Sequence, residues 1–129
     1  YAEDVDMVIA PGVEGTLGIL PNHAPLLTVL DTGELRIVKD GNETTMVLSK
    51  GFLEVLGNKV IILADAAERA DEIDEQRAQT AMVKAQEALE ERRPDMDLGI
   101  AVAALRRSQA RLKVAHKRRA RPQPSTPGL

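Results

Sequence analysis

The charged residues around residues 73–78, IDEQRA, have types and spacing that could hold an anion. If this stretch begins a helix, Asp74 and Arg77 are three residues apart and Lys84 is seven beyond Arg77, so they share one face. Guanidinium groups match the geometry of phosphate, which makes a phosphate-bearing molecule the candidate ligand. Asp74 and Glu68 could accept hydrogen bonds from a base or ribose, and each could equally be a first-turn acid of the helix.

A second pair of cations lies on a later predicted helix, where Arg107 and Arg111 are four residues apart and share a face. If the chain reverses near Asp95, Lys84 lies near Arg106 and Arg107, and Arg111 lies near Gln79. Cations that meet in this way repel one another unless an anion lies among them. The predicted cationic cluster comprises Arg77, Lys84, Arg107 and Arg111.

Residues that often carry catalysis are scarce in this chain, which has 129 residues, two histidines and no cysteine. His23 stands in a loop between Pro21 and Pro25, without a pattern of acids or nucleophiles around it. His116 lies in a separate, basic segment. We therefore predict no catalytic centre, and the lack of cysteine excludes thiol nucleophiles and thiolate metal sites.

The first half of the chain predicts β-structure. In the segment DVDMVIAP, apolar residues alternate with acids, as in a half-buried strand. Two later segments fold back at Asp40–Gly41 and Gly57–Asn58, which are dipeptides typical of tight hairpin turns. Short strands at this spacing predict a small sandwich or flattened barrel over residues 1–66.

From residue 67 onward the chain is rich in Ala, Glu, Gln and Arg, which favour helix. Pro94 ends a first helix and Asp97 is placed to cap a second, so residues 67–120 predict an antiparallel two-helix hairpin. The predicted stripes are Ala78, Ala81, Met82, Ala85, Ala88 and Leu89, then Leu98, Val102, Leu105, Gln109 and Leu112. Because alanine buries little area, we expect a hairpin able to leave its docking site. Residues 121–129, rich in Pro and Ser, are predicted to be disordered.

Charge is distributed unevenly along the chain, whose formal net charge is -3. Residues 1–66 carry 10 acids and 4 bases, residues 67–97 carry 10 acids and 5 bases, and residues 98–129 carry 8 bases and no acid. The basic segment could be a solvated face, a surface for an acidic protein or nucleotide, or a nucleic-acid surface. Nucleic acid is the least favoured, because the segment lacks aromatic residues for stacking. No apolar run approaches the roughly 18 to 20 residues of a membrane span.

Three segments resemble the epsilon subunit of F-type ATP synthases: PGVEGTLGILPNHAPLLTVLDTGELRI, SKGFLEV and NKVIILADAAERADEID. Their order and spacing are similar to that family across nearly the whole chain. The resemblance implies an α+β protein, in which an all-β N-terminal β-sandwich is followed by two antiparallel C-terminal helices. It also implies a non-catalytic subunit of the central stalk, or rotor, which couples proton translocation to ATP synthesis.

The resemblance further implies a set of partners. The sandwich would dock on the gamma subunit and on the ring of c subunits, with the loop around His23 facing the ring. The hairpin would permit ATP hydrolysis when it is folded against the sandwich, and inhibit it when it extends along gamma into the ring of alpha and beta subunits. Its basic second helix would then contact acidic surface on beta through Lys113, Lys117, Arg118 and Arg119. The subunit would lie peripherally on the cytoplasmic face of the bacterial plasma membrane, without inserting into it.

IDEQRA resembles the I/L-D-x-x-R-A motif of bacterial epsilon subunits, in which bound ATP holds the hairpin folded. By alignment with that pattern, the matching ligand positions are Glu68, Ile73, Asp74, Arg77, Ala78, Arg107 and Arg111. ATP would be a regulatory ligand rather than a required cofactor. Lys84 stands where the best ATP binders have arginine, so a bidentate phosphate contact becomes a point charge.

The sequence also departs from the family in its loops and at its start. Thr16 replaces an acid and Asn22 replaces a glycine. The chain starts at Tyr1 without the first strand that the family carries, which predicts a truncated or processed start. Two rival functions stay open: a stand-alone nucleotide sensor or basic adaptor, and a nucleic-acid-binding hairpin.

Overall fold

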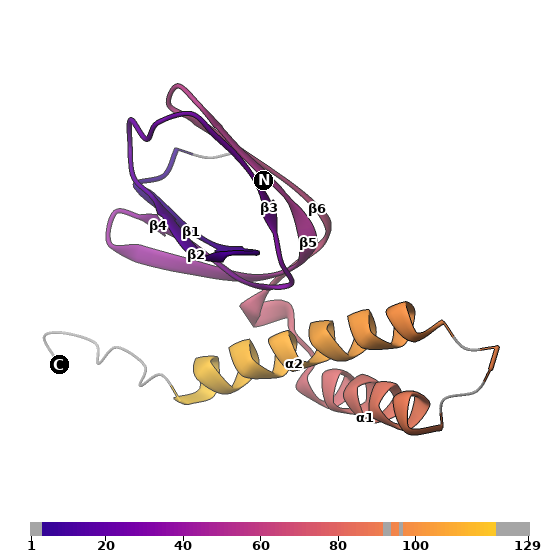
Figure 1. Cartoon of the computed structure of the whole chain (residues 1–129). Coiled ribbons are helices and arrows are strands. Elements are labelled where there is room, and N and C mark those ends of the chain that lie inside the picture. Colours follow the sequence, from indigo (N-terminus) through magenta and orange to yellow (C-terminus); the bar gives the residue numbers. More distant parts are fainter. Residues whose placement is uncertain (1–3, 92–93, 96, 121–129) are drawn as a thin grey trace, which may run out of the picture.

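The structure, a computed structural model, describes residues 4–91, 94–95 and 97–120. Residues 118–120 are described by their backbone only. Within that part, strands come first and helices follow (Figure 1). The strands are β1 (Met7–Gly12), β2 (Gly15–Ile19), β3 (Leu26–Leu30), β4 (Gly33–Lys39), β5 (Asn42–Leu56) and β6 (Lys59–Arg69). The helices are the short η1 (Ala70–Glu72), α1 (Glu75–Glu91) and α2 (Leu98–Ala120). This order confirms the predicted all-β domain followed by a helical hairpin.

The strands close into a flattened barrel, which forms the sandwich. Strand β1 pairs with β2 and β4 and, through one residue pair, with β3. Strands β3 and β4 both pair with β5, so a ring of antiparallel pairs surrounds one aliphatic core. The core consists of Val8, Ala10, Ile19, Leu30, Leu35, Ile37, Leu48, Leu53 and Val55.

Both predicted hairpin turns are present and join the strands tightly. Lys39 pairs with Asn42 across a two-residue turn, in which Asp40 and Gly41 have φ of 51 and 79 degrees. Leu56 pairs with Lys59 across Gly57 and Asn58 in the same way. Dipeptides of this type tolerate positive φ, which matches the twist of the flanking strands.

Strand β5 belongs to both layers of the sandwich because it bends in its middle. Its residues 42–48 pair with β4, whereas residues 51–55 pair with β3. Lys50 has a φ of 21 degrees at the bend, and a Cβ on Gly51 would lie 2.1 Å from the Leu63 carbonyl oxygen. Only glycine fits here, since β6 passes directly over this position.

Both helices begin at aspartate caps. The Arg77 N–H donates to Asp74 Oδ1 at 3.0 Å, and the Gly99 and Ile100 N–H groups donate to Asp97 Oδ1 at 2.9 and 3.3 Å. These bonds satisfy N–H groups that have no partner within the helix, and they confirm the predicted cap at Asp97.

The predicted apolar stripe is correct for α1 and partly wrong for α2. Every predicted stripe residue of α1 is buried or half-buried. On α2, Leu98 and Val102 are 51% and 43% exposed. The small residues Ala101, Ser108 and Ala115 are buried instead, and Val114 and Ala115 are buried in a cluster with Val47 of β5. Within residues 98–117, whose side chains the structure describes, the buried residues are Ala101, Ser108, Leu112, Val114 and Ala115.

The hairpin docks on the sandwich through α2, which contacts β4, β5 and η1 and separates the sandwich from α1 (Figure 1). Two successive residues of β5 point to opposite faces of the sheet. Leu48 points into the sandwich core, while Val47 points outward and is buried beneath the hairpin. Val47 forms a second apolar cluster with Ile73, Val114 and Ala115. Neither helix is long and apolar enough, in its described residues, to cross a membrane.

Candidate functional site between the sandwich and the hairpin

A cavity of about 440 Å³ lies where β5, β6 and the two helices meet. Its volume falls within the range of roughly 300 to 1,000 Å³ that is usual for small-molecule sites. The lining residues are Val47, Ser49, Ala66, Ala67, Glu68, Glu72, Asp74, Arg77, Ala78, Ala81 and Arg111. The cavity therefore has walls from both parts of the chain, and its shape depends on the docked position of α2.

An ion pair in the cavity wall joins the sandwich to α2. The Nε atom of Arg111 lies 2.7 Å from Glu68 Oε2, and about a third of each side chain is exposed. Glu68 belongs to β6, so the alternative that it is a first-turn helix acid is wrong. The pair joins the end of the last strand to the middle of α2.

The first turn of α1 supplies the opposite wall. Asp74 caps this helix and also lines the cavity, so its structural and ligand interpretations do not exclude each other. Arg77 and Ala78 follow in the first turn, where the positive end of the helix dipole favours anions. Arg77 and Arg111 can therefore face phosphate, while the carboxylates of Glu68, Glu72 and Asp74 can accept from hydroxyl or amino groups.

The structure brings together five of the eight residues predicted to bind ATP. Glu68, Asp74, Arg77, Ala78 and Arg111 all line the cavity. Of the others, Ile73 is buried in the apolar cluster beneath α2. Lys84 is exposed on α1 and Arg107 is half-buried on α2, and neither is among the lining residues. Two of the four predicted cations thus reach the cavity wall.

The antiparallel pairing of the helices agrees with the predicted reversal near Asp95. His116 Nε2 lies 3.0 Å from Glu75 Oε1, which joins the far end of α2 to the start of α1. Glu72, Ser49, Ala66 and Ala67 also line the cavity. Sequence reasoning missed these residues, because small or acidic side chains outside the motif carry no signal of their own.

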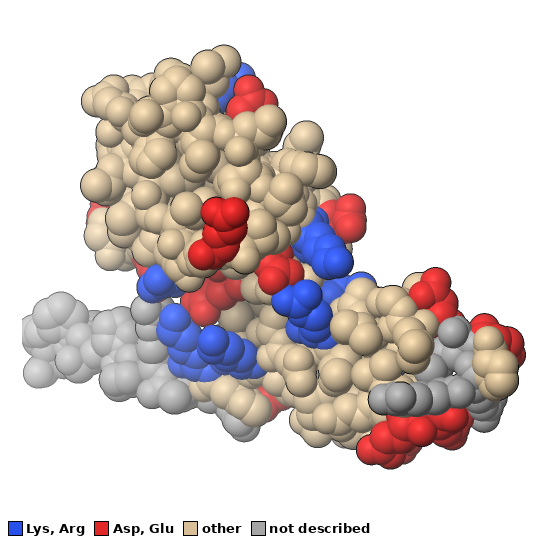
Figure 2. Space-filling view, in the orientation of Figure 1, with Lys and Arg blue, Asp and Glu red and all other residues tan. Residues whose placement is uncertain are grey.

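Two further ion pairs between the sandwich and α2 were also beyond sequence reasoning. Arg106 Nη2 lies 2.7 Å from Asp31 Oδ2, and Lys117 Nζ lies 2.9 Å from Glu34 Oε1. The partners are 75 and 83 residues apart in the chain. Figure 2 shows basic side chains gathered along the seam between the sandwich and the hairpin, with acidic side chains beside them.

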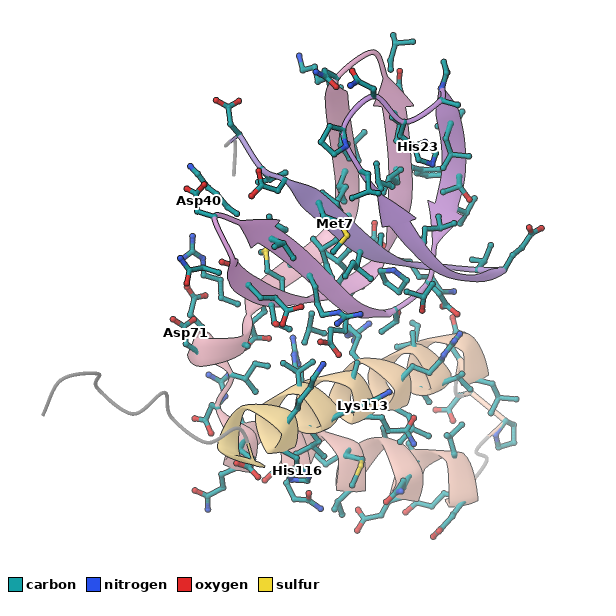
Figure 3. All side chains as sticks on the ribbon, turned by 90° about the vertical axis from the view of Figure 1, so that its left-hand side faces the viewer. Met7, His23, Asp40, Asp71, Lys113 and His116 are labelled. Carbon is teal, nitrogen blue, oxygen red and sulfur yellow. The ribbon has the colours of Figure 1, made fainter. Side chains whose placement is uncertain are left out.

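The residues predicted to contact partners lie in two separate regions, the far end of the sandwich and helix α2. His23 is at the end of the sandwich that is remote from the helices (Figure 3), and its Nδ1 lies 2.7 Å from the Ala24 carbonyl oxygen. Lys113 is exposed on α2, whereas Lys117 is engaged with Glu34. The side chains of Arg118 and Arg119 lie outside the described residues.

Known proteins are similar to both halves of the chain. Residues 1–70 match the family described as ATP synthase, Delta/Epsilon chain, beta-sandwich domain, and residues 71–116 match its long alpha-helix domain. An ATP synthase epsilon chain of Herpetosiphon aurantiacus is 57% identical over 120 residues, covering 93% of this chain and 88% of the relative. One of Dehalococcoides mccartyi is 48% identical over 124 residues, covering 95% and 89%.

A solved structure shares the fold at lower identity. A chain of the Euglena gracilis mitochondrial ATP synthase structure, which contains OSCP, F1 and the c-ring, superimposes with a TM-score of 0.65 at 24% identity. The superposition covers 93% of this chain and 71% of that chain. The likeness supports the architecture of a sandwich with two following helices.

Fold and cavity together define a class of small β-sandwich proteins that carry a docked two-helix arm. Because both family matches and the relatives agree along nearly the whole length, the chain belongs to the delta/epsilon family of ATP synthase subunits, as an epsilon chain. The resemblance of its sequence to epsilon subunits is thereby confirmed.

Proposed function

We propose that the chain is a non-catalytic rotor subunit of a proton-translocating ATP synthase, with ATP as a regulatory ligand of its hairpin. The observation that carries the proposal is the cavity of about 440 Å³, whose walls come from both the sandwich and the docked hairpin. A ligand that contacts both walls stabilises the docked state, because it binds that state alone.

The walls offer groups for each part of an ATP molecule. Arg77 and Arg111 supply guanidinium groups for phosphates, and the start of α1 adds its dipole. Glu68 and Asp74 supply acceptors for the base or ribose. The proposed site also includes Ile73, which holds the start of α1 against α2, and the neighbouring cations Lys84 and Arg107.

The outer face of the sandwich suits a docking surface for the gamma subunit. Val29, Phe52 and Leu63 are paired side by side across β3, β5 and β6. Their side chains are 45%, 55% and 67% exposed, so they form an apolar patch on one face. In the view of Figure 2, the upper part of the sandwich shows few charged side chains.

The far end of the sandwich suits contact with the c-ring. Leu20 and Leu56 are 60% and 63% exposed there. The Asn22 N–H donates to Asn58 Oδ1 at 3.0 Å, which ties the His23 loop to the β5–β6 turn. We place the subunit peripherally on the cytoplasmic face of the plasma membrane, with its hairpin reaching the alpha and beta subunits when it extends. Lys113, Lys117, Arg118 and Arg119 would then contact beta.

Calorimetric titration with ATP tests the ligand. The wild-type protein should bind with one site, and Arg111→Ala should weaken binding about tenfold or more, because a charge-assisted contact is lost. Lys113→Ala is the matched control, since it removes one cation from an exposed position on the same helix. Equal affinity in all three proteins, or no binding by the wild type, would rule out the site.

A pull-down with tagged protein tests the rotor role. We expect the gamma subunit to be retained, and Phe52→Lys to abolish retention by placing a charge in the apolar patch. Glu14→Lys, on an exposed turn, is the control. If wild-type protein binds ATP and retains no gamma, the stand-alone nucleotide sensor replaces the rotor subunit as the better account.

A further inference from the structure

Two ion pairs hold α2 to the sandwich outside the cavity. Arg106 meets Asp31 at 2.7 Å, and Lys117 meets Glu34 at 2.9 Å. The cations lie on either side of the position at which α2 enters the cavity wall, so they fix the helix at two separated points. None of the four residues lines the cavity, and a ligand there would leave both pairs in place.

The carboxylates are set in position by the sandwich itself. The Asp31 N–H donates to the Pro11 carbonyl at 2.8 Å, and the Thr32 N–H donates to Asp31 Oδ1 at 2.9 Å. Asp31 therefore presents Oδ2 to Arg106 without help from the hairpin. Glu34 lies within β4, and its Oε1 also lies 3.9 Å from Arg36 Nε of the same strand, so the sandwich holds this carboxylate as well if the hairpin leaves.

Apolar contact between the hairpin and the sandwich is limited. The buried cluster that joins them contains Val47, Ile73, Val114 and Ala115. Ile73 belongs to the start of the hairpin, so Val47 is the residue that the sandwich contributes to this cluster. Small aliphatic side chains contribute little area. Contacts worth even a small free energy each can therefore shift the balance between docked and undocked hairpin.

We propose that Asp31 and Glu34 form an ionic latch that keeps the hairpin docked in the absence of nucleotide. The inference rests on the proposed mobility of the hairpin, and it concerns contacts separate from the proposed ATP site. Because both pairs are partly exposed, salt weakens them, so the docked fraction falls as ionic strength rises.

Energy transfer between two dyes on the full-length protein tests the latch. Lys59→Cys and Gln86→Cys provide exposed attachment points on the sandwich and on α1, and the chain has no other cysteine. Adding Asp31→Asn with Glu34→Gln should lower the ratio of docked to undocked protein about threefold or more. The loss of energy transfer with rising NaCl should become shallower in that variant.

Glu14→Gln with Glu54→Gln is the matched control. It removes the same two charges from exposed positions of the sandwich, where neither carboxylate forms an ion pair within the described part of the chain, and it should leave energy transfer unchanged. Unchanged transfer in the Asp31→Asn, Glu34→Gln protein, together with the same salt response as wild type, would overturn the latch.

Charge exchange separates a latch from general damage to the fold. Asp31→Arg and Arg106→Asp should each lower energy transfer, and the two together should restore it. If the double exchange restores nothing, the pair does not hold the hairpin. A calorimetric ATP titration keeps the two proposals apart. If the wild type binds ATP and the variants leave energy transfer unchanged, the latch alone is removed. If the variants lower energy transfer and the wild type does not bind ATP, the ATP site alone is removed.

Discussion

At the scale of single residues, Asp31 responds to pH through its neighbours. Burial acts to raise the pKa of its carboxyl, but the Thr32 N–H, the Arg106 guanidinium and the charge of Lys50 together lower that pKa below its ordinary value of 3.8. A carboxyl whose pKa is lowered in the folded protein stabilises the fold fully above its ordinary pKa. This contribution is lost as the pH falls through the lowered value.

We predict that Asp31→Asn lowers the free energy of unfolding by less than about 1 kcal/mol at pH 7, because the pair with Arg106 is partly exposed. The difference from wild type should shrink below about pH 4, where the wild-type carboxyl begins to be protonated. Urea unfolding at pH 7 and at pH 3 measures it. A difference that is equal at both pH values contradicts the assigned role of the carboxylate.

The proposed ATP site shows how far a sequence motif can predict a binding site. Most of the proposed ligand residues lie within the segment from residue 68 to residue 78, so the sequence pattern and the fold bring them together for the same reason. Asp31 and Glu34 could not be found in this way, because nothing local marks a surface acid as the partner of a cation 75 or 83 residues later. Lys84 and Arg107 were predicted from helical spacing alone, and neither lines the cavity.

At the scale of elements, β5 decides how the sandwich and the hairpin meet. Its bend at Gly51 lets one half pair with β4 and the other with β3. The outward side chain of Val47 lies beneath α2, while that of Phe52 is exposed. The alternation of apolar and polar residues predicted the strands and their inward faces. It could not show which outward residues the hairpin would cover.

We predict that Gly51→Ala lowers the free energy of unfolding by about 1 to 3 kcal/mol, because the new Cβ overlaps the Leu63 carbonyl. Gly18→Ala is the control, since a Cβ there meets nothing within 4 Å. Urea unfolding of both variants measures the difference. Equal stability of the two variants would show that β6 gives way easily at this point.

At the scale of the whole molecule, a charge gradient along the chain becomes a seam in the fold. The basic final segment folds back so that its cations meet acids from the first 68 residues (Figure 2). The charge counts showed an acidic first part and a basic final segment, although they could not pair individual residues. The turn and cap signals predicted the hairpin. The docking of the hairpin on β4 and β5 needed the three-dimensional structure, because it depends on small residues and on pairs distant in sequence.

We predict that an ATP synthase assembled with residues 67–129 deleted from this chain hydrolyses ATP faster than the intact complex. The sandwich keeps its own core, so assembly should be preserved. Steady-state hydrolysis, with subunit composition checked by electrophoresis, measures the effect. Unchanged hydrolysis by a fully assembled complex would mean that the hairpin does not restrain the enzyme.

The most direct test of the central claim is energy transfer across the docking interface during an ATP titration. Protein labelled at Lys59→Cys and Gln86→Cys should show transfer that rises and saturates with ATP, because the nucleotide binds the docked state. Arg111→Ala should remove the rise, and Lys113→Ala should retain it. Transfer that stays constant while calorimetry shows ATP binding would contradict the account, because the ligand would then not hold the hairpin.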